Sequence, residues 1–296
     1  MSGMGGGWFD AMGGGWFDAM GGGWVDSPGG GGAGHGFAMR ADRPMAEHRL
    51  KKINVDDAFP VFPPRYWDSD LAALAYLPKF FTFTDANGKT WERAIVVEDP
   101  PPVVRSGSGG DSIDELLTLA VTERPEAMGE ILNQNQNQQL CFLQLLMMNR
   151  NSHPATYFAI KVMARIGEAV MIHFKRHFNR ARPSQVCPTL FPPVPVPGHA
   201  SYPAGHAVIA NLTAACLKDI VKGPANAPSR SSFDEALDLL AHNIGLNRVI
   251  AGLHYRSDIK AGAKAGKDTY DFLKQIEDFS NAIKDAKKEW AGPQLP

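Results

Sequence analysis

The sequence predicts an all-α protein, a helical bundle that carries one small β-hairpin. Two patterns support this fold class. From about Asp111 to the C-terminus, apolar residues recur at helical spacing in long segments rich in Ala, Leu, Ile, Lys and Glu. Only residues 80–97 alternate β-forming residues around a turn. With 296 residues, of which 44% are hydrophobic, the chain can bury the core that such a bundle needs.

The first elements are predicted from short patterns. Residues 69–77, SDLAALAYL, join a polar cap to helix-forming residues, and Pro78 is expected to end that helix. In residues 80–97, a central Asn-Gly pair predicts the turn of the hairpin. Residues 99–110 are rich in Pro, Gly and Ser and are expected to form a loop.

The remaining elements are predicted to be helices with one apolar face. They cover residues 111–124, 126–150, 155–180, 207–221, 233–251 and 257–290. The first opens with an Asp-Ser pair, which is typical of a helix N-cap. The Gln/Asn run at residues 133–139 is short and flanked by Leu and Ile, so we expect it to form a solvated helix face.

A glycine-rich tail, residues 1–44, is predicted to precede a single helical domain, residues 45–296. Residues 5–12 read GGGWFDAM, and residues 13–20 repeat them. Glycine at this density makes ordering costly in backbone entropy, which favours a disordered leader. The regular spacing of Trp and Phe leaves a second interpretation open, in which the tail binds a partner or a second copy of the chain. The chain would then be an assembly or cargo protein.

Composition argues against several classes of protein. The 30 Lys and Arg residues are balanced by 31 Asp and Glu residues, and such a near-neutral chain is not expected to bind nucleic acid. The three cysteines stand singly, so neither a disulfide framework nor a cysteine-based metal site is indicated. The sequence has no run of about 18 apolar residues and no legible signal peptide. We therefore expect no spanning membrane helix and a cytoplasmic location.

Three polar fragments interrupt the helical segments and supply the reactive side chains. Residues 175–183 read KRHFNRARP, residues 203–206 read PAGH, and residues 247–258 read NRVIAGLHYRSD. Lys175, Arg182 and Arg248 of these fragments supply three cations, and His206, His254 and Asp258 supply two histidines and a carboxylate. Such a set is typical of a site that binds an oxyanion and transfers a proton.

The spacing within the fragments supports an oxyanion site. Lys175 and Arg182 are seven residues apart, so on one helix they would point the same way. Gly205 precedes a helical run and offers a bare backbone N–H at a helix N-terminus, which suits an anion. Arg248 lies six residues before His254, roughly on one side of a helix.

The histidines and the carboxylate complete the predicted chemistry. Asp258 follows His254 at i+4, so its carboxylate can hold one imidazole nitrogen and fix the tautomer. His206 directly follows the glycine of the second fragment. A tetrahedral or trigonal-bipyramidal oxyanion fits these groups, with one histidine on its axis and the other handling a proton.

Together the fragments resemble the three-part signature of the type-2 phosphatidic acid phosphatase and vanadium haloperoxidase superfamily. That signature reads Lys-x6-Arg-Pro, then Pro-Ser-Gly-His, then Ser-Arg-x5-His-x3-Asp, and it covers about residues 175–258 here. The resemblance implies that superfamily's all-α fold and several groups around the oxyanion. These are Lys175, Arg182, Gly205, Arg248 and, at the serine position, Ala204. It also implies that His254 is the phosphate nucleophile or the axial vanadate ligand, His206 the general acid or base, and Asp258 the partner that orients His254.

Two positions depart from that signature. Ala204 replaces the serine of the second motif and removes one hydroxyl donor, so we expect a weaker site. Asn247 replaces the serine before Arg248 and can still donate through its amide. His199, seven residues before His206, resembles a histidine of algal vanadium bromoperoxidases and marks a candidate halide or substrate pocket. A loop histidine satisfied by solvent is the alternative.

Two activities fit the same pocket. In a vanadium-dependent haloperoxidase, bound vanadate would activate hydrogen peroxide to oxidise halide. In an acid phosphatase, a phosphomonoester would phosphorylate His254 and no cofactor would be needed. The loop around His199 favours the haloperoxidase. A zinc site at the H-x3-H pair of His173 and His177 is disfavoured, because two cations separate the pair and the glutamate of zinc-binding helices is missing.

Overall fold

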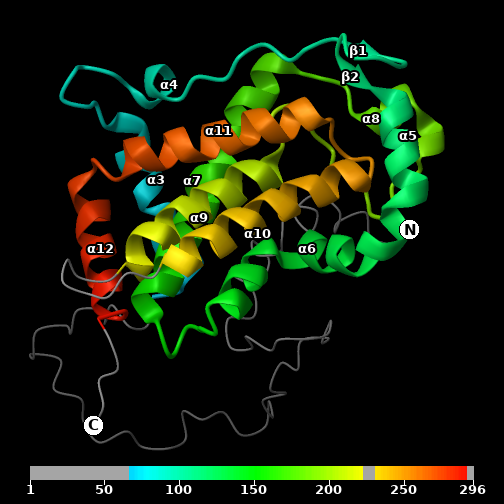
Figure 1. Ribbon diagram of the computed structural model, residues 1–296. Helices are drawn as coiled ribbons and strands as arrows, with labels where there is room; N and C mark the ends of the chain where they lie inside the picture. The colour runs from blue at the N-terminus through cyan, green and yellow to red at the C-terminus, as the bar shows by residue number, and fades with distance from the viewer. Residues whose placement is uncertain (1–66, 223–230, 292–296) are drawn as a thin grey trace, which may run out of the picture.

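The computed structural model describes residues 67–222 and 231–291, and this part of the chain is built almost entirely from helices (Figure 1). The all-α prediction is confirmed. The helices are α2 (Ser69–Leu74), α3 (Tyr76–Thr82), α4 (Trp91–Ala94), α5 (Ile113–Thr122), α6 (Arg124–Leu145), α7 (Pro154–Phe178), α8 (Pro183–Val186), α9 (Gly205–Val221), α10 (Ser231–Ile250), α11 (Arg256–Leu273) and α12 (Glu277–Lys288). A 3-10 turn, Pro188–Leu190, follows α8. The predicted tail with its GGGWFDAM repeats, residues 1–44, lies outside the described residues.

Helix α9 is the centre of the bundle. Fourteen of its seventeen residues are buried, and helices α7, α10 and α11 pack along it (Figure 1). Glycines allow α11 to approach α9 closely. A Cβ atom at Gly266 would lie 2.4 Å from the carbonyl oxygen of Val208, and one at Gly262 would lie 2.7 Å from that of Ala204. Because these contacts hold the first turn of α9, they fix where the second polar fragment lies.

The three polar fragments meet at one end of the bundle. The C-terminal ends of α7 and α10 and the N-terminal ends of α9 and α11 carry them. Backbone hydrogen bonds join these ends: the N–H of Ala204 donates to the carbonyl of Asp258 at 3.0 Å, and the N–H of Ser201 donates to that of Arg180 at 2.9 Å. Residues that are far apart in sequence are therefore held together by main-chain contacts.

The predicted hairpin over residues 80–97 is wrong. Thr84 and Thr90 form one antiparallel bridge, and helix α4 begins directly after it. The cause is the side chain of Trp91, which is buried and packs edge-on against Phe81 with ring centroids 5.2 Å apart. Aromatic packing of this kind contributes about 0.5–1.5 kcal/mol beyond the burial of the rings.

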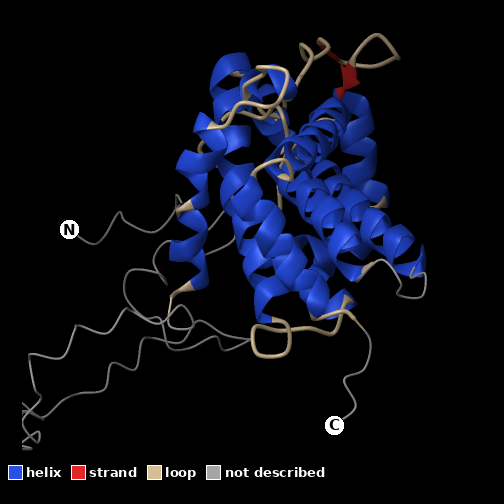
Figure 2. Ribbon diagram, turned by 90° about the vertical axis from the view of Figure 1, so that its left-hand side faces the viewer, coloured by secondary structure: helices blue, strands red, loops and turns tan. Residues whose placement is uncertain are grey.

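The described residues form a single sheet, and it is parallel. Strand β1 (Val103–Val104) pairs with β2 (Asp111–Ser112), and both lie at one end of the helical bundle (Figure 2). Strand β1 lies within the predicted loop, residues 99–110, and β2 begins directly after it. The N-cap prediction for the following helix agrees with the structure, since Ser112 Oγ accepts from the N–H of Glu115 at 3.3 Å.

Two helix boundaries differ from those predicted. Pro78 does not end a helix, because it lies in the first turn of α3, where the missing N–H has no intrahelical partner to lose. The segment predicted as one helix over residues 257–290 is divided into α11 and α12, with the break between Leu273 and Glu277. Neither difference moves the three polar fragments.

Candidate active site

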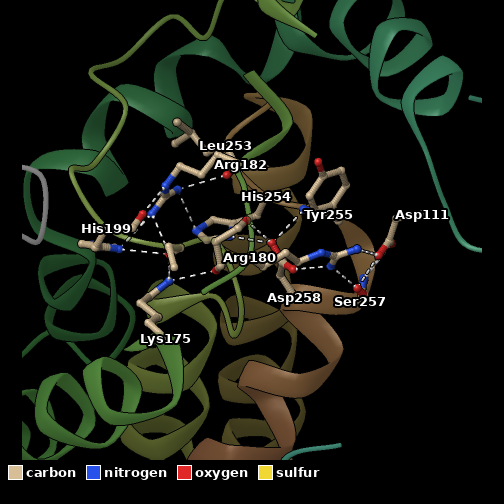
Figure 3. A network of polar contacts seen from close by, with 12 residues as sticks. Asp111, Lys175, Arg180, Arg182, His199, Leu253, His254, Tyr255, Ser257 and Asp258 are labelled. Atoms are coloured by element: carbon tan, nitrogen blue, oxygen red, sulfur yellow. Dashed lines mark hydrogen bonds and ion pairs between the residues drawn. The ribbon is translucent and has the colours of Figure 1, made fainter. Parts of the chain in front are cut away.

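The first fragment is divided between a helix and the loop that follows it. Lys175 lies in the last turn of α7, and Asn179 ends that helix with a φ of +46°. Arg182 is extended and precedes Pro183, as is usual for the residue before a proline. The two cations therefore do not share one helix as predicted, yet both reach the same buried region (Figure 3).

Lys175 is buried beneath the loop that precedes α9. Its Nζ donates to the carbonyls of Ala200 at 2.7 Å and Ser201 at 2.8 Å. An ammonium group has three donors, so one remains for a ligand. Burial, and then the charge of Arg182, lowers the pKa of Lys175 well below its ordinary value of 10.5. A bound anion would favour the charged form and raise that pKa again.

Arg182 spans the two loops that form the site. Its Nε donates to the carbonyl of His199 at 2.8 Å, and its Nη1 donates to that of Leu253 at 3.0 Å. Burial lowers the pKa of Arg182 to about 10, so the group stays charged at neutral pH. The nearby carboxylate of Asp258 pairs with Arg180 instead. The positive charge of Arg182 is therefore left for an anion.

Arg248 is fully buried and is held by helix α6. Its Nη2 donates to the carbonyl of Ile131 at 2.9 Å and lies 3.4 Å from Oε1 of Gln134. Among the described residues, its Nε and Nη1 have no hydrogen-bond partner. A buried donor left in this way costs about 1–3 kcal/mol. These two atoms therefore mark where the oxygens of a ligand would bind.

Helix α6 supports the site, which was not expected from its sequence. The run at residues 133–139 was expected to be solvated, but Gln134 is only 3% exposed and Gln138 only 6%. Oε1 of Gln134 also accepts from Nδ2 of Asn247 at 3.0 Å, and the same amide donates to Glu130 at 2.8 Å. Asn247 thus directs its side-chain amide to α6. The four-residue spacing of Gln134 and Gln138 is the signal that could have marked a buried face.

His254 lies in the loop between α10 and α11. It does not share a helix with Arg248 as predicted, because α10 ends at Ile250 and Gly252 follows with a φ of +77°. The imidazole Nδ1 is 3.0 Å from Oδ2 of Asp258, in the first turn of α11. An ionised carboxylate can only accept, so Nδ1 carries the proton and Nε2 keeps its lone pair.

The protonation of His254 and Asp258 follows from burial and from their neighbours. Burial, and then the charge of Arg182, lowers the pKa of His254 to about 3. Burial alone would raise the pKa of Asp258, but the hydrogen bonds from His254 and Ser201 and the charge of Arg180 lower it to about 2. At neutral pH the imidazole is therefore neutral, and its Nε2 lies 3.4 Å from Nη1 of Arg182.

The second fragment forms the start of α9. Gly205 and His206 are its first two residues, and the N–H groups of a first helical turn have no intrahelical partners. Ala204 is the N-cap residue and is fully buried. Burial, and then the charges of Arg248 and His254, lowers the pKa of His206 well below 6.5. The dipole of α9 and the imidazole of His206 both lie at this end of the bundle.

The remaining histidines have different surroundings. Nδ1 of His199 lies 3.0 Å from Nη2 of Arg182, so this residue belongs to the cationic cluster and is not a loop histidine facing solvent. Burial, and then the charges of Lys175 and Arg182, lowers the pKa of His199 to about 4. His173 packs edge-on against Trp91, with ring centroids 4.7 Å apart. Nowhere in the described part of the chain do three or more His, Cys, Asp or Glu residues gather as metal ligands would.

This arrangement is that of a helical protein with a buried cluster of cations, histidines and a carboxylate. The sequence profile described as the PAP2 superfamily matches residues 156–266, which contain all three polar fragments. This match agrees with the resemblance to the type-2 phosphatidic acid phosphatase superfamily that the fragments predicted. The match supports a phosphatase-type function. It gives no support to the haloperoxidase activity that the sequence favoured, or to vanadate as a cofactor.

Comparison with solved structures gives a match to a membrane enzyme. The chain is similar to the crystal structure of a transmembrane PAP2-type phosphatidylglycerolphosphate phosphatase from Bacillus subtilis, with 17% identity and a TM-score of 0.42. The match covers 56% of this chain and 84% of that one. No curated protein sequence matches the chain.

The expected cytoplasmic location is corrected by this comparison, because the matched enzyme is a transmembrane protein. The expectation rested on the lack of a legible signal peptide and of a long apolar run, and neither observation fixes a cellular compartment. Within residues 67–222 and 231–291, no helix combines the length and the apolar character needed to cross a bilayer.

Proposed function

We propose that the chain is a phosphatase that hydrolyses phosphomonoesters through a phosphohistidine at His254. One observation carries the proposal. The neutral imidazole of His254 presents its unprotonated Nε2 beside the guanidinium of Arg182, while Asp258 holds Nδ1 on the other side. A nucleophile activated by a carboxylate and placed next to an anion-binding cation is what phosphoryl transfer requires.

The substrate phosphate would be bound by charge-assisted hydrogen bonds. Lys175, Arg182 and Arg248 supply three cations, and the N–H groups at Gly205 add the positive end of the α9 dipole. These groups would bind the three non-bridging oxygens, over which negative charge is spread in the transition state. Because the cations are buried, each interaction is stronger than it would be in water.

In the first chemical step, Nε2 of His254 attacks the phosphorus atom and the bond to the ester oxygen breaks. His206, protonated, gives its proton to the departing oxygen, so an alcohol leaves and not an alkoxide. The phosphohistidine carries a positive imidazole, which the ionised Asp258 stabilises through Nδ1–H.

In the second step, a water molecule attacks the phosphohistidine. His206, now neutral, takes a proton from that water while its oxygen forms the new bond to phosphorus and the P–N bond breaks. Inorganic phosphate leaves, His254 is neutral again and His206 is protonated. No cofactor is needed, because both proton transfers and the nucleophile come from the chain.

The decisive assay compares two reactions of the purified protein. We expect hydrolysis of an aryl phosphate, and we expect orthovanadate to inhibit it, because vanadate adopts the trigonal-bipyramidal shape of the transition state. The same protein loaded with orthovanadate is tested for peroxide-dependent bromination. Vanadate-dependent bromination without aryl phosphate hydrolysis would overturn the proposal in favour of the haloperoxidase.

The pKa of His206 predicts the pH dependence of the reaction. Because this pKa lies well below 6.5 in the free site, only a small fraction of His206 is protonated at neutral pH. We expect kcat/KM to rise as the pH falls from about 8 to about 5, by up to about tenfold per pH unit. The pH profile of His206→Asn should keep only the dependence due to ionisation of the substrate phosphate. An identical profile for both proteins would show that His206 is not the acid.

The replacement Ala204→Ser is expected to raise turnover. A serine there would place a hydroxyl at the N-cap of α9, where it can stabilise the helix by about 0.5–2 kcal/mol. The same hydroxyl can donate to the phosphate, and such donors change kcat by up to about 10²-fold. The measurement is the initial rate at saturating aryl phosphate, beside the melting temperature. An equal or lower rate with unchanged stability would mean that this position does not face the phosphate.

A further inference from the structure

We propose that Arg180 and Asp111 form a positioning pair that holds Asp258 in the orientation His254 needs. The inference rests on the proposed phosphatase mechanism, in which Asp258 orients the nucleophile. Neither residue touches the site where the phosphate would bind. Arg180 lies two residues before Arg182 in the first fragment, and Asp111 comes from β2, far outside the family match at residues 156–266.

Arg180 points away from the anion-binding cations. Figure 3 shows its guanidinium between Asp258 and Asp111, on the other side of His254 from Arg182 and His199. Because residues two apart in a regular extended strand would face the same side, these opposite directions show that the loop after α7 is not a regular strand.

The guanidinium is bound at both ends. Its Nη1 donates to Oδ1 of Asp258 at 2.7 Å, and its Nη2 donates to Oδ2 of Asp111 at 2.8 Å and to the carbonyl of Pro101 at 2.9 Å. Its plane lies over the ring of Tyr255, with the Cζ atom 4.2 Å from the ring centroid. Arg180 is 9% exposed, Asp111 8% and Asp258 0%, so solvent competes little with these contacts.

The two oxygens of Asp258 therefore have separate partners. Oδ1 is held by Arg180, whereas Oδ2 accepts from Nδ1 of His254, from Oγ of Ser201 and from the N–H of Tyr255. Rotation of the carboxylate would break contacts on both sides at once. Arg180 thus keeps Oδ2 directed at the imidazole and helps Asp258 stay ionised when His254 becomes positive.

Asp111 gives Arg180 a fixed position. Its Oδ1 accepts from the N–H of Ser257 at 3.1 Å, and its Oδ2 accepts from the hydroxyl of the same serine. The parallel pairing of Asp111 with Val103 fixes the backbone from which the carboxylate extends. Asp111 therefore links the segment around β1 and β2 to the first turn of α11, where Asp258 lies.

The test uses three variants of Arg180 and Asp111. Arg180→Gln is expected to lower kcat by about 10²-fold with a smaller change in KM, because the nucleophile is misplaced. It should also shift the acid limb of the kcat–pH profile upward by about 1–3 units, because Asp258 loses its cation. Arg180→Lys should restore the acid limb but not the full kcat, since an ammonium cannot bridge two carboxylates as a planar fork does. Asp111→Asn should lower kcat without moving the acid limb.

The matched control is Arg176→Gln, which changes an exposed arginine four residues earlier and should behave as the parent. A second readout is independent of activity: the tautomer of His254 in nitrogen-15-labelled protein, observed by NMR. We expect a single Nδ1-protonated form in the parent and Arg176→Gln, and a mixture in Arg180→Gln.

Failure of the parent to hydrolyse aryl phosphate would remove the proposed function but leave this readout intact. Circular dichroism identifies any variant that does not fold. If Arg180→Gln does not fold, the test is made with Asp111→Asn, which keeps an acceptor oxygen for Arg180. An unchanged tautomer and acid limb in a folded Arg180→Gln would overturn the proposal.

Discussion

An alanine in place of His254 is expected to abolish turnover while leaving inorganic phosphate bound. The cations that would hold the anion are separate from this imidazole, so calorimetry should still detect binding. Loss of the nucleophile removes covalent capture altogether, and kcat should fall by at least about 10⁴-fold. The measurement is acid quenching with a labelled aryl phosphate, which traps phosphohistidine in the parent. The matched control is His242→Ala, at an exposed position of α10, which should form the trapped phosphohistidine as the parent does.

The companion variant His206→Ala separates the two histidines by role. It should keep the anion and the phosphohistidine but slow turnover by about 10²–10⁴-fold, as is usual when an acid or base is lost. The loss should be smallest for an aryl phosphate with an acidic leaving group, which needs little protonation. If His206→Ala lost the anion and His254→Ala still formed a covalent adduct, the two roles would be reversed.

The grouping of the candidate site residues could be predicted from the sequence, because the three fragments carry them at characteristic spacings. His254 directly precedes Tyr255, the N-cap residue of α11, and Asp258 lies in the first turn of that helix, so the four-residue spacing brings the two side chains together although His254 is outside the helix. The geometric reason given for Arg248 and His254 was wrong, since α10 ends between them and Gly252 turns the chain with a positive φ. The backbone hydrogen bonds of the loop, not helical periodicity, bring the two residues together.

The supporting residues could not be predicted because they come from distant segments with ordinary composition. Gln134 lies in a polar run that reads as a solvated helix face, and its burial depends on Asn247, more than a hundred residues later. Asn137 adds a kink to α6, with φ −158° and ψ 92°, which no local signal announces. Asp111 reads as a helix-capping residue, and only the tertiary structure directs its carboxylate to Arg180. Long-range pairing of this kind has no periodic signature.

Removal of the Arg248 side chain is expected to abolish activity and weaken oxyanion binding without loss of the fold. This guanidinium is fully buried, forms no ion pair with a described carboxylate, and leaves Nε and Nη1 without partners among the described residues. Burial lowers its pKa to about 10, which shows that the charged form is costly here. Charge-assisted hydrogen bonds to a bound phosphate would offset that cost, each worth about 1.5–3 kcal/mol. Arg248→Ala should therefore lower phosphate affinity by about 10- to 150-fold.

A comparison with Arg182→Ala makes the prediction for Arg248→Ala sharper. Arg182 joins two loops through the carbonyls of His199 and Leu253, so its loss should lower both the phosphate affinity and the melting temperature of the anion-free protein. Arg248→Ala should lower the phosphate affinity but leave the melting temperature unchanged. The substitution removes hydrogen bonds to α6, which are stabilising, together with a buried unpaired charge, which is destabilising. In both variants the rise in melting temperature that phosphate produces in the parent should disappear. Calorimetric titrations that gave the parent's phosphate affinity in both variants would show that the anion binds elsewhere, and the site built here from the three fragments would have to be abandoned.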